Sequence, residues 1–156
     1  MSAKLSVTET SIVIVISEFN QSIIENLLQG ALDAFAHHGG AESGIHIHRV
    51  PGAFEIPGTI QQIMKCHNPN AIIALGAVIR GETPHFNYIA RESANGIAEI
   101  SRSSNIPIIN GILTTDNARQ AEDRSQVGGR NKGWDAMEAA LKTINVYQEI
   151  FSASKC

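Results

Sequence analysis

Four short stretches of the chain are rich in apolar residues. They cover residues 11–16, 44–50, 71–79 and 106–113, and isoleucine and valine dominate them. The second stretch alternates apolar and polar positions, whereas the other three are apolar at nearly every position. Continuous apolar runs of this length are typical of strands that are covered on both faces, as in parallel sheets. We therefore predict four β-strands.

The segments between these runs carry apolar residues at helical spacing. In residues 21–40 they recur every three or four positions, and the pattern closes on two glycines, a common signal for the end of a helix. The same spacing predicts further helices over residues 55–66, 84–104, 117–125 and 134–151. The fourth of these predicted helices is short, and the fifth is long and amphipathic.

The order of the elements indicates the fold class. Strands that alternate with helices of this length form βαβ units and a parallel sheet. We predict an α/β fold, a three-layer α/β/α sandwich around a central, mainly parallel four-stranded sheet. Residues 1–156 contain no repeat or linker and are expected to form one domain, with a polar N-terminal arm at residues 1–10. Ligands of such sheets bind beyond the carboxyl ends of the strands, here after Ile16, Val50, Ile79 and Leu113.

Composition and charge narrow the range of functions. The 156 residues are 43% hydrophobic and 17% charged, which is typical of a globular protein, and the formal net charge is -3. This charge argues against a nucleic-acid or membrane-surface partner but leaves small anionic ligands open. The apolar run IVIVI is too short to span a bilayer, and the polar first ten residues lack the core of a signal peptide.

Cysteine and histidine usage indicates a reduced, cytoplasmic protein without a metal site. Cys66 and Cys156 are too few for a disulfide framework and do not have metal-binding spacing. His46 and His48 share one face of a predicted strand, but no acidic residue or cysteine stands at a suitable distance from them in the sequence. We expect no metal ion and a cytoplasmic location.

Aromatic and acidic residues follow the first two strands. Phe19 offers a flat face to a planar ligand, or it packs on the helix that follows. Asn20 is a candidate cap for that helix. Glu55 stands at the start of the next predicted helix, where the helix dipole favours its charge. The dipole alone explains Glu55, and hydrogen bonding to a polyhydroxylated ligand explains it equally well.

The third strand is followed by the sequence GETPH. Thr83 is predicted to be the N-cap of the next helix, with Pro84 as its first residue. The backbone amides near Glu82 and Thr83 would then lie at a helix N-terminus, which attracts anions. His85 follows in the first turn, where it could transfer protons to or from a bound anion. A lone histidine is more often structural, so both interpretations stand at this point.

Two basic residues lie beyond the fourth strand. Arg124 and Lys132 are candidate partners for a bound anion, and arginine suits contacts with phosphate because it presents two donors side by side. Taken alone, each residue is explained more simply as an ordinary surface charge.

Five motifs together resemble those of one enzyme family. SEFN, VPGAFEIP, ALGAVIRGETPHFNY, NGILTTDN and NKGWDAMEAAL occur in the order and at the spacing found in lumazine synthases (6,7-dimethyl-8-ribityllumazine synthases). The resemblance covers nearly the whole chain and implies a flavodoxin-like fold. It also implies a transferase that needs no cofactor and acts in the penultimate step of riboflavin biosynthesis. The reaction condenses 5-amino-6-(D-ribitylamino)uracil with 3,4-dihydroxy-2-butanone 4-phosphate to give 6,7-dimethyl-8-ribityllumazine, phosphate and water.

The resemblance assigns a role to each candidate residue. His85 matches the catalytic histidine and would transfer protons. Glu82, Thr83 and Arg124 would hold the phosphate group of the substrate. The residues that would contact the pyrimidine and its ribityl chain are Phe19, Ala53, Phe54, Glu55, Ala77, Val78, Ile79 and Asn110. Asn20 and Lys132 are secondary candidates near the same pocket.

The resemblance further implies a homo-oligomer built from rings of five subunits. Asn110 and Arg124 would reach the site of the adjacent subunit. A pentamer, a pair of pentamers and an icosahedral shell all stay open. The stretch SQVGGRNKG differs in sequence from the turn found in shell-forming members, but its length is unchanged, so it does not decide between them. Riboflavin synthase is a candidate second partner.

Other functions stay open on the residues alone. The chain could bind flavin or lumazine compounds without turnover. Asn110 keeps this option open, because the family often has an aromatic residue there and asparagine stacks less well on a ring. The chain could also act mainly as a structural shell. A fourth role is electron transfer by a reversibly bound flavin mononucleotide.

Overall fold

The computed structural model describes residues 6–154. Residues 1–5 of the predicted arm and Cys156 lie outside the described residues. Within the rest of the arm, Val7–Glu9 forms a short 3-10 turn, η1, and Val7 packs against the core. Thr10 is buried, and its hydroxyl donates to the Ser6 carbonyl at 3.0 Å.

The four predicted strands are present and form one parallel sheet. They are β1 (Ile12–Ser17), β2 (Ile45–Val50), β3 (Ala71–Ile79) and β4 (Ile108–Thr115), and their order is β2-β1-β3-β4. This is the order of flavodoxin-like folds. All of β1 and most of β3 are buried, whereas the edge strand β2 is largely exposed, which explains why the sequence of β2 alternates and the other two are continuously apolar.

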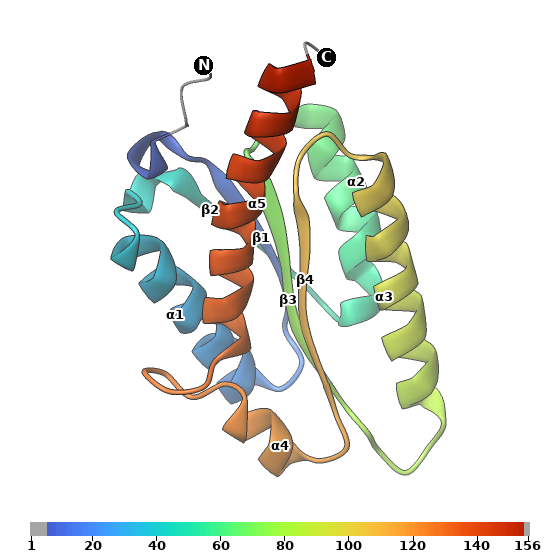
Figure 1. The fold of residues 1–156 in the computed structure, drawn as a ribbon. Helices are drawn as coiled ribbons and strands as arrows, with labels where there is room; N and C mark the ends of the chain where they lie inside the picture. The colour runs from blue at the N-terminus through green and yellow to red at the C-terminus, as the bar shows by residue number, and fades with distance from the viewer. Residues whose placement is uncertain (1–5, 155–156) are drawn as a thin grey trace.

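Helices cover both faces of the sheet, as Figure 1 shows. The helices α1 (Gln21–His37) and α5 (Lys132–Ser154) lie on one face, against Ile12, Ile14 and Ile16 of β1. The helices α2 (Ile56–Cys66) and α3 (His85–Ser103) lie on the other face, against Val13 and Val15. Because successive side chains of a strand point to opposite faces, one apolar strand serves both layers. The predicted three-layer α/β/α sandwich is confirmed.

Three short helical segments complete the fold. The helix α4 (Ala118–Asp123) follows β4, and its Ala121 joins the core on the α1 and α5 side. The 3-10 turns η2 (Glu42–Gly44) and η3 (Ala53–Glu55) precede β2 and α2. All five predicted helices are therefore present.

Two predicted caps differ from the structure. The prediction of Thr83 as the cap of α3 is wrong, because Pro84 occupies that position and the helix begins at His85 without a side-chain cap. The Pro84 carbonyl accepts the Asn87 N–H at 3.1 Å, so a tight turn opens the helix one residue later than predicted. Asn20 does occupy the cap position of α1, but its side-chain amide donates to the Ala77 carbonyl at 3.3 Å instead of capping the helix.

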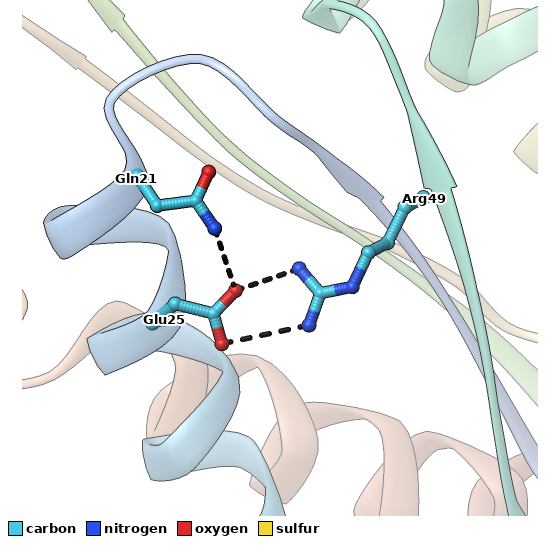
Figure 2. A network of polar contacts seen from close by, with 3 residues as sticks. All are labelled: Gln21, Glu25 and Arg49. Atoms are coloured by element: carbon cyan, nitrogen blue, oxygen red, sulfur yellow. Dashed lines mark hydrogen bonds and ion pairs between the residues drawn. The ribbon is translucent and has the colours of Figure 1, made fainter.

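A polar network joins α1 to β2, as Figure 2 shows. Arg49 donates to both carboxylate oxygens of Glu25, at 2.7 and 3.5 Å, and Gln21 donates to the same carboxylate at 3.3 Å. The side chains of Arg49 and Glu25 are 38% and 43% exposed, so the pair contributes little to stability. It gives the first turns of α1 a fixed position beside β2.

Candidate active site

A cavity of about 560 Å³ opens beyond the carboxyl ends of the central strands. Its walls come from the turn after β1, from η3, from the end of β3 and from the start of α3. Ten of the predicted site residues line it: Phe19, Asn20, Ala53, Phe54, Glu55, Ala77, Val78, Ile79, Thr83 and His85. The location agrees with the general rule for ligand sites in open parallel sheets.

Aromatic rings form one side of the cavity. Phe54 and Tyr88 stack nearly parallel, with ring centroids 6.2 Å apart and an angle of 16° between the planes. The side chain of Phe19 lies at the mouth and is 70% exposed, so it does not pack on α1 as a core residue would. Exposed, flat apolar surfaces around a concavity are suited to a planar ring system.

The turn that presents Phe19 is held in an unusual conformation. Asn20 has φ 63° and ψ 62°, in the left-handed region, where asparagine is more easily accommodated than most residues. Its side-chain bond to Ala77 ties this turn to β3, and its carbonyl accepts the Ile24 N–H at 3.0 Å to start α1. Asn20 therefore determines the direction in which Phe19 leaves the sheet.

The end of β3 leaves backbone groups beside the cavity. The pairing of β1 with β3 ends at Ile16 and Leu75, whereas the pairing of β3 with β4 continues to Ile79 and Thr115. Residues 77–79 therefore extend beyond β1 on that side of the strand. The Asn20 side chain donates a hydrogen bond to the Ala77 carbonyl, and the neighbouring residues of β3 line the cavity.

Glu55 lies where η3 meets α2. Its backbone carbonyl accepts the Thr59 hydroxyl at 2.8 Å, and its side chain makes no cap bond to α2. The carboxylate lines the cavity close to Gly52, where an added Cβ would come within 3.3 Å of Oε1. The absence of a side chain at Gly52 keeps this corner open to a ligand.

The turn before α3 carries polar groups with no partner in the described chain. Gly81, Glu82 and Thr83 are exposed and make no hydrogen bond to another described residue. His85 begins α3 and is exposed on the cavity wall, and its ring makes no hydrogen bond within residues 6–154. Gly81, Thr83 and His85 therefore lie together on the cavity wall, at the positive end of the α3 helix dipole.

Four other predicted residues do not line the cavity. Glu82 lies between lining residues but is not itself part of the wall. Asn110 lies on β4, where its Oδ1 accepts the Ile112 N–H at 3.0 Å, and it lines a separate groove against α3. Arg124 ends α4 and donates to the Gln120 carbonyl at 3.1 Å, and Lys132 is an exposed residue at the start of α5.

Sequence reasoning did not identify three further cavity residues of α3. Phe86, Tyr88 and Ile89 line the wall beside His85. A signal was available for two of them, because Tyr88 and Ile89 stand three and four positions after His85 and therefore share its helix face. The side chain of Tyr88 is 56% exposed, so this face of α3 is not part of the core.

The described residues contain neither a candidate metal site nor a helix that could span a membrane. In residues 6–154, no group of three or more histidine, cysteine, aspartate or glutamate side chains is close enough to hold a metal ion. None of the described helices is both long enough and apolar enough to cross a membrane.

Comparisons with known proteins connect this chain to one enzyme family. A family model described as 6,7-dimethyl-8-ribityllumazine synthase matches residues 9–148. A protein named 6,7-dimethyl-8-ribityllumazine synthase, from Chlorobium limicola (strain DSM 245 / NBRC 103803 / 6330), is 41% identical over 145 residues. The matched region covers 93% of this chain and 94% of that protein. All of the candidate residues, from Phe19 to Lys132, fall within the span of the family model.

Proposed function

Because the chain belongs to the 6,7-dimethyl-8-ribityllumazine synthase family, we propose that the cavity beyond β1 and β3 is its active site. The enzyme condenses 5-amino-6-(D-ribitylamino)uracil with 3,4-dihydroxy-2-butanone 4-phosphate in the penultimate step of riboflavin biosynthesis. One observation carries the site assignment. His85 lies beside the turn Gly81–Thr83, which makes no hydrogen bonds to described residues, in a cavity with aromatic walls. One end of the cavity suits an anion and the other suits a flat ring.

The turn before α3 is proposed to bind the phosphate group. The amides of Glu82 and Thr83 and the Thr83 hydroxyl are donors that no described residue uses. A dianionic phosphate is favoured at this place because the N-terminus of α3 carries partial positive charge. The Glu82 side chain is exposed and would repel the phosphate, so Glu82 contributes its amide alone.

The aromatic end is proposed to bind the ribitylaminouracil. Phe19 would stack on the pyrimidine, and the backbone of Ala77, Val78 and Ile79 would pair with its polar edge, since this part of β3 extends beyond β1. Ala53, Phe54 and Glu55 lie along the opposite wall, where the Glu55 carboxylate can accept hydrogen bonds from ribityl hydroxyls.

His85 is proposed to transfer protons during the condensation. The 5-amino group of the pyrimidine adds to the ketone and loses water to form an imine. Loss of phosphate, ring closure and a second loss of water complete the lumazine. Each step needs a proton added or removed, a task for which enzymes most often use histidine near neutral pH. Holding the two substrates together in one cavity would supply a further part of the acceleration.

A homo-oligomer is proposed to complete the site. Asn110 and Arg124 lie outside the cavity of their own chain, whereas the exposed rings of Phe19, Phe54 and Tyr88 leave that cavity open on one side. A ring of five subunits, alone or in multiples, would bring Arg124 of one chain to the phosphate site of the next. Lys132 and Asn110 would approach the same boundary. Riboflavin synthase stays a predicted partner that would take up the product.

An assay with both substrates tests the active-site proposal. The purified protein is expected to form a fluorescent lumazine only when both substrates are present, and His85→Ala is expected to slow this reaction. Mixed oligomers of His85→Ala and Arg124→Ala chains provide the test of a shared site. If adjacent subunits share it, some boundaries in the mixture carry both native residues, and activity at low substrate exceeds the sum of the two variants. No gain on mixing would contradict the shared site, and binding without product would contradict the assignment of the cavity.

A further inference from the structure

We propose that Arg80 is a positioning residue that closes the turn between β3 and α3 into one defined shape. Arg80 lies outside the cavity lining, yet its contacts reach both ends of the turn that presents Thr83 and His85. The inference rests on the proposed binding of phosphate to that turn. It adds a residue that would act on the reaction through others and without touching the substrate.

The first end of the turn is anchored to β4 and to the segment after it. The Arg80 N–H donates to the Thr115 carbonyl at 2.9 Å and extends the pairing of β3 with β4 by one residue. The Arg80 Nε donates to Asp116 Oδ1 at 3.0 Å. Asp116 is itself fixed, because its N–H donates to the side-chain oxygen of Gln120 at 2.8 Å. The guanidinium therefore has a defined position above the sheet.

The face of the same guanidinium reaches the other end of the turn. Its central carbon lies 4.6 Å from the centroid of the Phe86 ring, a cation–π contact. Phe86 belongs to the first turn of α3, directly after His85, and lines the cavity. Arg80 thus contacts a residue six positions further along the chain. We call Arg80, Asp116 and Phe86 the turn clasp.

The residues within the turn have no other constraint of this kind. Gly81, Glu82 and Thr83 make no hydrogen bonds to described residues, and α3 begins without a side-chain cap. Without the turn clasp, the Thr83 amide and hydroxyl would take several positions relative to His85. A displacement of about 1 Å is enough to slow an enzyme by up to about 100-fold when it separates reacting groups.

Fold stability is a weak explanation for the ion pair within the turn clasp. The side chains of Arg80 and Asp116 are 47% and 67% exposed, and exposed ion pairs contribute little to folding. Arg49 and Glu25 form a comparable exposed pair between α1 and β2 (Figure 2), and neither residue lines the cavity. Arg49 is therefore a matched control for Arg80.

The competing explanation is that Arg80 binds the phosphate directly. The two roles differ in what Asp116 does. If Arg80 acts through the turn, removing the Asp116 charge loosens the turn clasp and weakens phosphate binding. If Arg80 contacts the phosphate, removing a competing negative charge strengthens binding. A lysine at position 80 would retain the charge but lose the planar face and the Nε donor.

Steady-state kinetics of five variants separates these roles. Arg80→Ala is expected to raise the KM for the butanone phosphate and to lower kcat, each by about 5- to 10-fold, with the pyrimidine KM within about twofold. Asp116→Asn is expected to act in the same direction but less strongly, and the double variant to match Arg80→Ala alone, since the two residues act as one unit. Arg80→Lys is expected to stay impaired, and Arg49→Ala to behave as the wild type.

Two kinetic results would overturn the proposal. One is an Arg80→Ala variant with unchanged constants. The other is a lower KM in Asp116→Asn together with recovery in Arg80→Lys, which would make Arg80 a direct ligand. Hydrogen exchange gives a readout that needs no turnover. Protection of the Asn87 amide, which donates to Pro84, is expected to fall in Arg80→Ala and Asp116→Asn but not in Arg49→Ala. If the protection of the Asn87 amide did not change in these variants, the turn clasp would be contradicted, whether or not the wild-type enzyme is active. If protection fell but the wild-type enzyme were inactive, the turn clasp would stand and the proposed active site would be wrong.

Discussion

The turns that lead into α3 and α5 use polar groups in opposite ways. Ahead of α5, Asn131 is 3% exposed, and its side-chain amide donates to the carbonyls of Asn26 and Gln126 at 3.0 and 3.4 Å. Its side-chain oxygen accepts the Trp134 N–H at 3.0 Å and so caps the helix. Gly30 of α1 leaves room for this side chain, because an added Cβ there would collide with it. Ahead of α5, the side-chain amide and oxygen of Asn131 thus all bond within the chain.

The start of α3 is left without such partners. Pro84 stands at the cap position, and the exposed residues Gly81–Thr83 and the His85 ring make no hydrogen bonds to the described part of the chain. A buried polar group needs a hydrogen-bond partner inside the protein, whereas an exposed group can bond to water and exchange it for a ligand. The difference suggests that Asn131 serves the fold and that the turn before α3 serves the reaction.

Asn131→Ala should give the largest loss of stability. It removes the cap of α5 and the two hydrogen bonds from the buried Asn131 amide to Asn26 and Gln126, so unfolding should become easier by about 3 kcal/mol while kcat changes less than about twofold. Urea unfolding at fixed protein concentration measures the loss. Asn131→Asp retains the capping oxygen but places a carboxylate oxygen against the Asn26 and Gln126 carbonyls, so it should also lose stability. A loss below about 1 kcal/mol in Asn131→Ala would remove the contrast between the two turns.

His85→Ala should give the converse result. Loss of a proton-transfer group lowers kcat by about 100-fold, equivalent to about 2.7 kcal/mol in the activation barrier. Because the ring is exposed and makes no bonds to described residues, unfolding should change by less than about 0.5 kcal/mol. An unchanged rate would reject His85 as the proton carrier, and a large loss of stability would reassign it to the fold.

Arg124→Ala tests a residue that bonds to the turn before α5 and is also proposed to bind the substrate phosphate. Its carbonyl accepts the Lys132 N–H at 2.9 Å, next to the Asn131 turn, while its side chain is proposed to reach the phosphate site of a neighbouring subunit. Loss of a charged hydrogen bond should raise the KM for the butanone phosphate by about 10-fold, which corresponds to about 1.4 kcal/mol. The pyrimidine KM should stay the same. If the pyrimidine KM alone moved, the phosphate assignment would be wrong.

Glu138→Gln should give the smallest effect on stability. It tests whether the contact between α1 and α5 depends on pH. A hydrogen bond from His38, at 2.7 Å, lowers the pKa of the Glu138 carboxyl below its usual value of 4.5, although partial burial opposes this shift. A lowered pKa adds stability above the usual pKa, and this stability is lost as the pH falls through the folded value.

Thermal unfolding at two pH values measures this contribution. Glu138→Gln should lower the midpoint by about 1–2 °C at pH 7, because the pair is partly exposed, and by less at pH 3. Glu149→Gln is the control, since Glu149 is exposed and no described residue bonds to its side chain. Equal shifts at both pH values would show that the charge of Glu138 does not matter.

The elements of the fold follow directly from local sequence patterns. The apolar run at residues 71–79 matches β3 residue for residue, because a strand buried between two helical layers must be apolar on both faces. The start of α5 was predicted two residues late. Its cap depends on Asn131 bonding to Asn26, a residue more than a hundred positions away, which no local pattern reveals.

Site residues could not be predicted from the sequence where their roles depend on contacts with residues far away in the chain. Phe19, Glu55 and His85 follow predicted strands, so the rule for strand ends brings them to one cavity. Arg80 was missed because its role depends on Asp116, 36 positions later, in a different connection. The cap assigned to Thr83 failed because a favourable residue type does not determine which carbonyl opens the helix.

The central claim is that the uncapped turn before α3 holds the phosphate of the substrate beside His85. A crystal structure of the protein soaked with 3,4-dihydroxy-2-butanone 4-phosphate tests it most directly. We expect the phosphate within hydrogen-bonding distance of the Thr83 amide and hydroxyl, with the carbon chain directed toward the imidazole of His85. A phosphate bound elsewhere, with the Gly81–Thr83 amides facing solvent, would contradict the account.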